Sequence, residues 1–180
     1  TVVRIAFYRG EIAMRKTVDQ MLAEHTLMAL HMTYCRAVDR CDWDLLRSVF
    51  HPDARFRYGH FDGDLEGFLA MAAAGLAAYQ GTTHCVGNQL VEIAPDGHSA
   101  WAEHYTVATH RLAAGEGLPE RDFVLSIRYV DRAECRDGDW RLVERMLLRD
   151  WWRTDPVAPS DEPRVPSTSR RDRTDPSYRS

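Results

Sequence analysis

Three stretches in the first half of the chain carry apolar residues at helical spacing: residues 18–40, 42–50 and 66–79. Thr17 and Gln20 have the T-x-x-Q spacing of a capping box, which predicts that the first helix begins at Val18. The apolar positions of this helix cover more than one narrow stripe, so we expect it to lie in a groove with both flanks covered. The second helix is expected to end before Pro52, because proline cannot continue a helix.

Elsewhere the pattern changes to the alternation of apolar and polar residues that is typical of strands. These segments are rich in Val, Thr, Tyr, Phe and Trp and are separated by turns that contain Gly, Pro and Asp. Strands are expected over residues 55–60, 83–93, 100–112, 123–133 and 140–151. Helices first and a run of antiparallel strands afterwards predict an α+β fold and not an alternating, doubly wound sheet.

The chain is expected to form one folded domain over residues 1–154, followed by a tail over residues 155–180. Five of the eight prolines lie in the tail, together with many Ser, Arg and Asp residues. Too few of its side chains are apolar to form a core. We therefore expect the tail either to stay loose or to lie along a neighbouring subunit.

Composition narrows the choice of partners. The 180 residues are 44% hydrophobic and 28% charged, a balance typical of a soluble globular domain. A net charge of −4 supplies no positive field, so nucleic acid and anionic lipid are not expected partners. No apolar run is long enough to span a membrane, and four dispersed cysteines without a secretory signal predict a reducing cytoplasm.

Several common chemistries lack their sequence motifs. The chain has no glycine-rich phosphate loop, no dinucleotide-binding fingerprint, no G-x-S-x-G elbow and no H-E-x-x-H pair. His104 and His110 share one face of a strand, but six residues separate them by roughly 20 Å, too far to share a metal ion. We therefore expect neither a cofactor nor a metal ion.

Two protonatable residues remain in segments whose neighbours predict burial. Asp39 ends the first helix, and His84 opens a strand in the run Thr82-Thr83-His84-Cys85-Val86-Gly87-Asn88. Alone, each has an ordinary explanation. A helix-end aspartate is most often solvated, and a single strand histidine is more often structural than catalytic.

The order of several short motifs has a specific resemblance. A long helix with Y-x-x-x-x-D is followed by W-D-x-L, F-x-P-D-A, T-x-H-x-x-G-N and R-D-G-x-W. Over residues 17–154 this order resembles the SnoaL-like branch of the nuclear transport factor 2 superfamily, which includes scytalone dehydratase, hexachlorocyclohexane dehydrochlorinase and bile acid 7α-dehydratase. The resemblance implies a conical α+β barrel, with helices packed on a curved antiparallel sheet around a deep pocket.

The resemblance also implies roles for individual residues. Asp39 and His84 match the Asp-His dyad of these enzymes, and Tyr34 and Tyr58 match two tyrosines of the bile acid dehydratase. Arg149 matches that enzyme's arginine, whereas Arg145 stands where the dehydrochlorinase has its own. The chain departs from the dehydrochlorinase at Tyr34, where that family has lysine, and at Phe56, where it has tryptophan. Dehydrochlorination is therefore not the expected reaction.

The regular geometry of strands and helices predicts which of these side chains can meet. By alternation, Arg145, Arg149 and Trp151 share one strand face, so both arginines could face the same cavity. Tyr34 and Asp39, however, lie about 140° apart on an ideal helix of 3.6 residues per turn. They can converge only if the helix distorts or ends near Ala37.

The expected function is a cofactor-independent lyase of the dehydratase type. His84 would take a proton from carbon, Asp39 would hold the imidazole, and Tyr58 with Tyr34 or Arg149 would donate to the departing or developing oxyanion. The expected substrate is an apolar aromatic or polycyclic alcohol or ketone. Further pocket-lining residues are Phe56, His104, Arg145 and Trp151.

Three other functions remain open at this point. The same dyad could release formaldehyde from a lignin-derived aromatic dimer or could move a double bond, as ketosteroid isomerases do. The fold also serves as a non-catalytic binding or scaffold subunit. An apolar outer sheet face predicts a homo-oligomer. The resemblance implies a dimer or a trimer, of which the trimer is favoured.

Overall fold

The computed structural model describes residues 16–158 and 169–178. The first fifteen residues of the expected domain and residues 159–168 of the expected tail lie outside the described residues. The elements are, in chain order, α1 (Val18–Arg40), α2 (Trp43–Ser48), β1 (Phe50–Arg57), β2 (Asp62–Asp64), α3 (Leu65–Leu76), β3 (Gly81–Ile93), β4 (Ser99–Leu112), β5 (Arg121–Arg136) and β6 (Asp139–Pro156).

Capping side chains set the helix starts. The expected capping box is present at α1, where the Thr17 side chain accepts from Gln20 N and Gln20 Oε1 accepts from Thr17 N. The expected extent of the second helix is wrong, because α2 ends at Ser48 and Phe50 already begins β1. Pro52 is tolerated in that strand because its pairing with β6 shifts register between Phe50 and Arg55.

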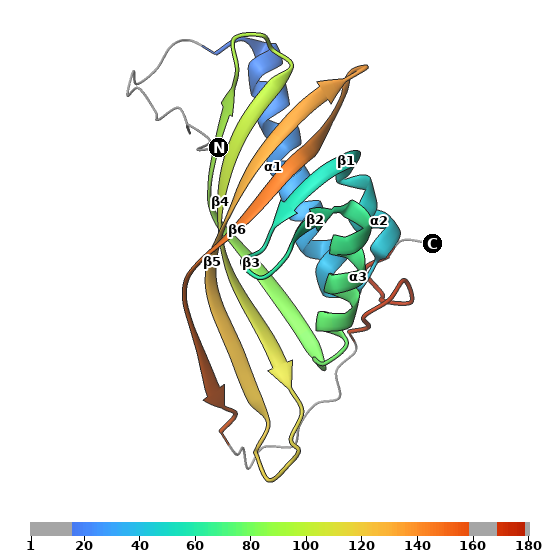
Figure 1. Ribbon diagram of the computed structural model, residues 1–180, viewed down its shortest axis with the longest axis vertical. Helices are drawn as coiled ribbons and strands as arrows, with labels where there is room; N and C mark the ends of the chain where they lie inside the picture. The colour runs from blue at the N-terminus through green and yellow to red at the C-terminus, as the bar shows by residue number, and fades with distance from the viewer. Residues whose placement is uncertain (1–15, 159–168, 179–180) are drawn as a thin grey trace.

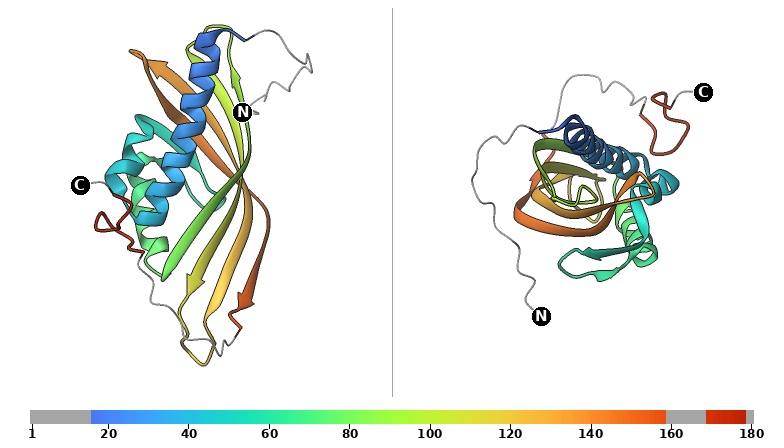
Figure 2. Two further views of the ribbon diagram at one scale, coloured as in Figure 1. Left: turned by 180° about the vertical axis from the view of Figure 1, so that it is seen from behind. Right: turned by 90° about the horizontal axis from the view of Figure 1, so that it is seen from above.

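One mixed sheet holds all six strands, in the order β2-β1-β6-β5-β4-β3. Neighbouring strands are antiparallel except β1 and β6, which run parallel, so the expectation of a purely antiparallel sheet is wrong at this pair. The sheet is strongly twisted, and the helices cover one of its faces (Figures 1 and 2). The expected α+β cone is confirmed as an open one, because β2 and β3 remain unpaired edges among the described strands.

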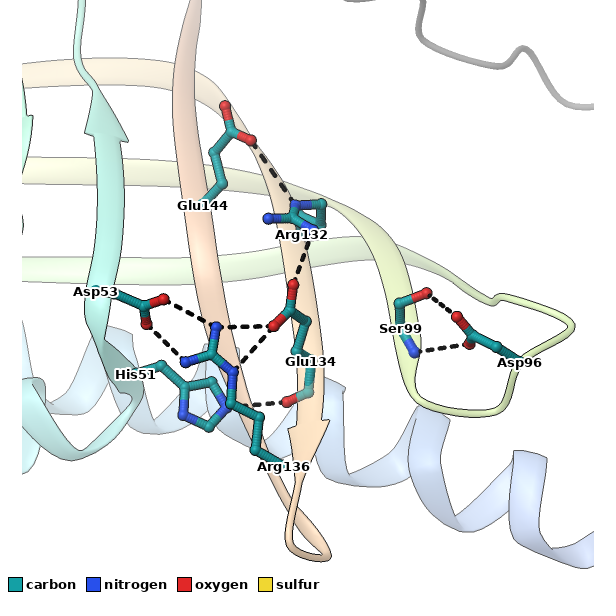
Figure 3. Close-up of polar contacts among 8 residues, drawn as sticks. All are labelled: His51, Asp53, Asp96, Ser99, Arg132, Glu134, Arg136 and Glu144. Carbon is teal, nitrogen blue, oxygen red and sulfur yellow. Dashed lines mark hydrogen bonds and ion pairs between the residues drawn. The ribbon is translucent and has the colours of Figure 1, made fainter.

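Polar contacts hold the parallel strand against the hairpin between β5 and β6. Arg136 binds Asp53 of β1 through two hydrogen bonds of 2.8 and 3.0 Å, and it also binds Glu134 (Figure 3). His51 lies with Nε2 3.1 Å from the carbonyl oxygen of Glu134. These contacts fix where β1 lies along the hairpin, although exposed ion pairs of this kind stabilise only slightly.

The strand register decides which side chains face the helices. Directly opposed residues of antiparallel strands point to the same sheet face. One row across the sheet joins His84, Ala108, Leu125 and Trp152. The row of Val91, Ala102, Asp131 and Arg145 lies further along the same face. The concave, helix-covered face therefore carries both His84 and Arg145.

Residues 169–178, which we call the C-terminal segment, return to the body of the protein. In Figures 1 and 2 this red segment lies beside α2 and α3. Arg173 and Tyr178 bind Asp42 between α1 and α2. The expectation of a loose tail is therefore wrong for these residues, which lie against the helices of their own chain. Strand β6 also continues to Pro156, past the expected domain end at residue 154.

Candidate active site between α1 and β3

The structure brings Asp39 and His84 into direct contact. His84 Nδ1 lies 2.8 Å from Asp39 Oδ1, and the His84 backbone N–H donates to Asp39 Oδ2 at 3.0 Å. Because a carboxylate only accepts, Nδ1 carries the proton, and in the neutral imidazole Nε2 has the free lone pair. Thr82, two residues earlier on the same strand face, donates its hydroxyl to Asp39 Oδ1 at 2.8 Å. The carboxylate is thus fixed by three donors from β3.

A sharp corner at the end of α1 presents Asp39 to β3. The helix continues to Arg40, and its C-cap Cys41 adopts a left-handed conformation with φ of 50°. The Asp42 N–H then donates to Ala37 O at 2.9 Å, and the Asp42 side chain caps α2 through Leu45 N. Asp39 therefore stands in the last helical turn, directly before the chain reverses direction.

Asp39 and His84 line a groove of about 430 Å³ between α1 and the edge strand β3. The dyad is mostly buried, with 14% of the Asp39 side chain and 5% of the His84 side chain exposed. The other residues that line the groove are Met32, Cys35, Arg36 and Arg40 from α1, and Cys85 and Val86 from β3. A small molecule in this groove would reach the dyad from the sheet edge.

Aromatic side chains continue from the dyad across the sheet. The His84 ring lies edge-on to His110, with centroids 5.5 Å apart, and His110 packs against Tyr79 and Phe123. Phe123 in turn lies 5.9 Å from the Trp152 ring. Tyr79, Phe123 and Trp152 were not among the expected site residues, although Phe123 and His110 are directly opposed on β5 and β4.

Tyr34 and Tyr58 meet each other and do not meet Asp39. Their hydroxyl oxygens are 2.8 Å apart, and the Tyr34 ring packs on Phe50 and Tyr129. Because α1 stays regular past Ala37, Tyr34 and Asp39 remain on different helix faces, as the helical angle predicts. Burial raises the pKa of both tyrosines, so both hydroxyls stay protonated and can donate.

A buried polar cluster lies deeper in the cone. The Arg145 guanidinium binds Asp131 through two hydrogen bonds of 2.7 and 2.6 Å, and it donates to His31 Nδ1 at 3.0 Å. It also lies 4.0 Å from the Tyr34 ring centroid. His104 stacks on His31 with centroids 4.0 Å apart. The expected pocket residues His104 and Arg145 therefore belong to one buried structural cluster.

His31 and Asp131 are functional candidates that the sequence argument missed. A usable signal existed for His31, because His31, Cys35 and Asp39 follow at intervals of four and so share one face of α1. The Cys35 sulfur lies 3.9 Å from His31 Nε2 and also borders the groove. Cys35 therefore lies between the buried cluster and the dyad.

The donor set of this cluster already surrounds a cation. Ligand atoms of His31, His104 and Asp131 lie within 4.8 Å of one another, close enough for a metal site. Arg145 Nη2, however, lies 2.6 Å from Asp131 Oδ2 and 3.0 Å from His31 Nδ1. Two of the three residues are thus already bound to a cationic side chain, so they do not fit a metal ion while Arg145 is present.

Phe56 and Arg149 lie away from the groove. Phe56 is fully buried and stacks on Phe68 with centroids 4.1 Å apart, so it belongs to the packed core. Arg149 opposes Ile127 on the concave face but is exposed. The nearby carboxylates do not pair with it either, because Asp122 binds Arg111 and Asp131 binds Arg145.

Trp151 does not share a face with Arg145, so the expectation from simple alternation is wrong. The pairing of β5 and β6 shifts register between Ser126 and Ile127, which leaves Asp150 as an extra residue. Trp151 therefore opposes Ser126 on the outer face, and Trp152 opposes Leu125 on the concave face. Trp152, and not Trp151, reaches the aromatic row beside the dyad.

The buried histidines predict a loss of stability in mild acid. Burial lowers the pKa of His104 and of His110 to about 4, and at His110 the neighbouring His84 adds to this effect. Imidazoles in the unfolded chain titrate near 6.5, so between these values the unfolded state binds more protons. We expect the free energy of unfolding to be highest above about pH 6.5 and to fall towards pH 4, by on the order of 3 kcal/mol per histidine.

Urea unfolding at a series of pH values measures this slope directly. The His104→Asn variant retains a polar group near Gln89 but cannot take up the proton. It should therefore lose part of the slope between pH 6.5 and 4. Equal slopes for the native protein and the variant would show that His104 does not titrate as its burial requires.

The geometry defines a class of protein: helices on one face of an open, curved α+β cone, with an Asp–His pair beside a groove. The open cone with helices on one face is the fold of nuclear transport factor 2-like proteins. The SnoaL-like domain matches residues 19–146, so the chain belongs to the SnoaL-like domain family.

Solved structures share this fold at low sequence identity. A type 2 hexachlorocyclohexane dehydrochlorinase (LinA) has a TM-score of 0.69 and 19% identity, with 80% of this chain and 98% of that chain covered. A putative scytalone dehydratase from Novosphingobium aromaticivorans has a TM-score of 0.66 and 16% identity, with 79% of this chain and 98% of that chain covered. A point variant of Rv3472 from Mycobacterium tuberculosis, a protein of unknown function, has a TM-score of 0.62 and 23% identity, with 77% of this chain and 78% of that chain covered. The TM-scores show a common fold, but at such low sequence identity they do not show a common activity. The activity must therefore be inferred from the site.

A search of curated proteins found no sequence match. Within the described residues, none of the helices has the length and apolar character needed to cross a membrane.

Proposed function

We propose that the protein is a cofactor-independent lyase that catalyses dehydratase-type elimination with Asp39 and His84. The observation that carries the proposal is the 2.8 Å contact between His84 Nδ1 and a carboxylate that Thr82 and the backbone also hold. No hydrogen bond to His84 Nε2 occurs among residues 16–158 and 169–178. Nε2 is therefore free to take a proton from a substrate in the groove.

In the proposed reaction, Nε2 of His84 removes a proton from the carbon next to the one that bears the leaving group. The electron pair of that C–H bond forms the double bond, and the C–O bond breaks with its electron pair on oxygen. The resulting hydroxide takes the proton from the His84 imidazolium and departs as water. Asp39 keeps the proton on Nδ1 and stabilises the imidazolium as it forms. Tyr58, with Tyr34 or Arg149, supplies the hydrogen bond to the oxygen on which negative charge gathers.

The geometry favours Tyr34 over Arg149 as the partner of Tyr58. The two hydroxyls are already hydrogen-bonded, and the Arg145 guanidinium against the Tyr34 ring stabilises negative charge there. Arg149, by contrast, is exposed and lies away from the groove. Arg145, His104 and Phe56 would act indirectly, because Arg145 packs on Tyr34, Phe56 packs beside Tyr58, and His104 belongs to the buried cluster of Arg145.

The expected substrate is an apolar aromatic or polycyclic alcohol or ketone. The aromatic row of His110, Phe123 and Trp152 supplies flat ring surfaces that begin next to His84. The four free cysteines are consistent with a reducing cytoplasm, which we propose as the location.

Product analysis tests the proposed reaction. The full-length protein is incubated with a panel of aryl and steroidal alcohols and ketones, and products are identified by mass spectrometry and NMR. Loss of water supports the dehydratase. Release of formaldehyde or a shifted double bond would replace it with one of the two related reactions, and tight binding without turnover would indicate a binding subunit.

We also propose that the protein forms a homo-oligomer through the outer face of the sheet, with a trimer favoured and a dimer possible. Val107 and Trp151 lie in one row of that face, both opposite Ser126, and are 45% and 46% exposed. Leu90 and Tyr105 extend the patch and are similarly exposed. Exposed apolar surface of this kind typically marks an interface.

A charge within this patch should dissociate the oligomer. We expect Val107→Glu to reduce the mass measured by light scattering to that of a monomer, because a carboxylate cannot be buried there without a partner. Leu118→Glu is the matched control, since Leu118 is 48% exposed but lies in the loop between β4 and β5. A monomeric native protein, or equal masses for the two variants, would contradict this assembly.

A further inference from the structure

The C-terminal segment folds around a single carboxylate. Asp175 Oδ2 accepts from Arg170 N at 2.7 Å, and Oδ1 accepts from Ser177 N at 2.9 Å. These backbone N–H groups hold the pKa of Asp175 well below its usual range. The ten residues therefore form a defined turn that presents its other side chains to the body of the protein.

Three side chains near Asp39 bind this segment. Arg36 donates to Ser177 O at 3.2 Å and lies 4.5 Å above the Tyr178 ring. Arg40 Nε lies 3.4 Å from Asp175 Oδ2. Asp42 accepts two hydrogen bonds from Arg173, of 2.8 and 3.1 Å, and one of 2.9 Å from the Tyr178 hydroxyl.

The same segment reaches the chain that leads to His84. Arg171 Nη1 donates to the carbonyl oxygens of Leu76 and Tyr79, at the end of α3 and in the turn before β3. Tyr79 packs on His110, which lies edge-on to His84. One short segment thus contacts both the helix end that carries Asp39 and the turn that introduces His84.

The corner after Asp39 requires this support. Cys41 is in the left-handed region, a conformation that is unfavourable for a non-glycine residue. The Asp42 carboxylate is buried, and a buried charge is costly unless it is paired. Arg173 supplies that partner and lowers the pKa of Asp42 to about 2.

We propose that the C-terminal segment is a positioning element of the active site, and that Arg173 and Tyr178 act as positioning residues for the Asp39–His84 pair. They act through Asp42, and Arg171 acts through the turn before β3. The proposal rests on the proposed function, because it assigns the segment a role in that same site. Arg36 and Arg40 also line the groove, so the segment fixes one of its walls as well.

The experiment uses the full chain labelled with ¹⁵N-histidine, with the His84 signals assigned from their absence in His84→Ala. In the native protein we expect His84 to be the Nδ1–H tautomer. In Arg173→Gln we expect a large part of the population to shift to the Nε2–H tautomer, which free imidazole prefers. With a substrate found by product analysis, kcat should fall about 10- to 100-fold while KM changes little.

Three further variants make the result specific. Arg173→Lys should restore much of the native tautomer, because it returns the charge to Asp42. Tyr178→Phe removes a single hydrogen bond and should give a smaller shift, which keeps the test usable if Arg173→Gln does not fold. Asp172→Asn is the control, because the Asp172 side chain hydrogen-bonds Thr174, within the segment, and should leave the spectrum native.

The outcome separates this proposal from the catalytic one. Suppose Arg173→Gln and Tyr178→Phe keep the native His84 tautomer while hydrogen exchange shows the segment released from α1. The segment then packs on the helices without affecting His84, and the positioning role is wrong. If His84→Ala retains turnover while Arg173→Gln still shifts the tautomer, the positioning role stands and the catalytic role of His84 is wrong.

Discussion

His84→Ala should lower kcat for the elimination by about 10³- to 10⁴-fold, because the variant lacks the only group proposed to take the carbon-bound proton. Asp39→Asn should give a loss of similar order. An asparagine amide can donate to Nδ1 and so favours the wrong tautomer of His84. The double variant should be little worse than either single variant, since residues that act as one unit are not additive. Steady-state kinetics on the substrate found by product analysis measure all three.

His25→Ala is the matched control for this series, because His25 is an exposed histidine on α1. Its kcat should equal that of the native protein. A His84→Ala protein that is folded by circular dichroism and turns over substrate at the native rate would remove the proposed base. The binding-subunit hypothesis would then be the better one.

Arg145→Gln should destabilise the protein by about 3–5 kcal/mol, the cost typical of breaking a buried ion pair from one side. Asp131 is fully buried and accepts two hydrogen bonds from Arg145, so the variant leaves a charge without its partner. Typical domains are stable by only about 5–15 kcal/mol, and this change therefore removes a large fraction of the total. Urea unfolding at pH 7 measures the loss.

Two further variants test whether that loss of stability comes from the buried carboxylate. Arg141→Gln breaks an exposed pair with Asp139 and should cost less than about 1 kcal/mol. The double variant Asp131→Leu/Arg145→Met replaces the pair with apolar groups and should recover most of the stability. If the double variant is as unstable as Arg145→Gln, the loss comes from packing around the side chain and not from the unpaired carboxylate.

The sequence predicts well those features that depend on local chemistry. The capping box at Thr17 places the start of α1, and the change from helical to alternating spacing gives the α+β class. The spacing of the T-x-H motif is also a local feature, because residues two apart on a strand share a face. Thr82 and His84 accordingly bind the same carboxylate. Only the resemblance, however, connected His84 to Asp39, which is 45 residues away.

Register shifts explain most of what the sequence could not predict. Counting back from the Asp137-Gly138 turn pairs Asp131 with Glu144, but a shift between Arg132 and Ala133 pairs it with Arg145. A second shift, next to Ile127, moves Trp151 to the outer face. Each shift adds one residue to β6, and no local pattern marks the positions where alternation fails.

Long-range charge pairs explain the rest. The tail has too few apolar residues to form a core, yet residues 169–178 are held by arginine, carboxylate and carbonyl contacts with chain more than 90 residues away. Periodicity carries no information on such contacts. Composition alone therefore predicted a loose tail.

The position of β6 has a consequence for biosynthesis. Of the described strands, this one is the last to leave the ribosome, but it lies between β1 and β5. Strand β1 is made much earlier and has only the three-residue β2 as a neighbour until β6 arrives. The nascent chain therefore exposes an incomplete sheet until β6 has been made, and closure of long chain loops should make folding slow relative to helical proteins.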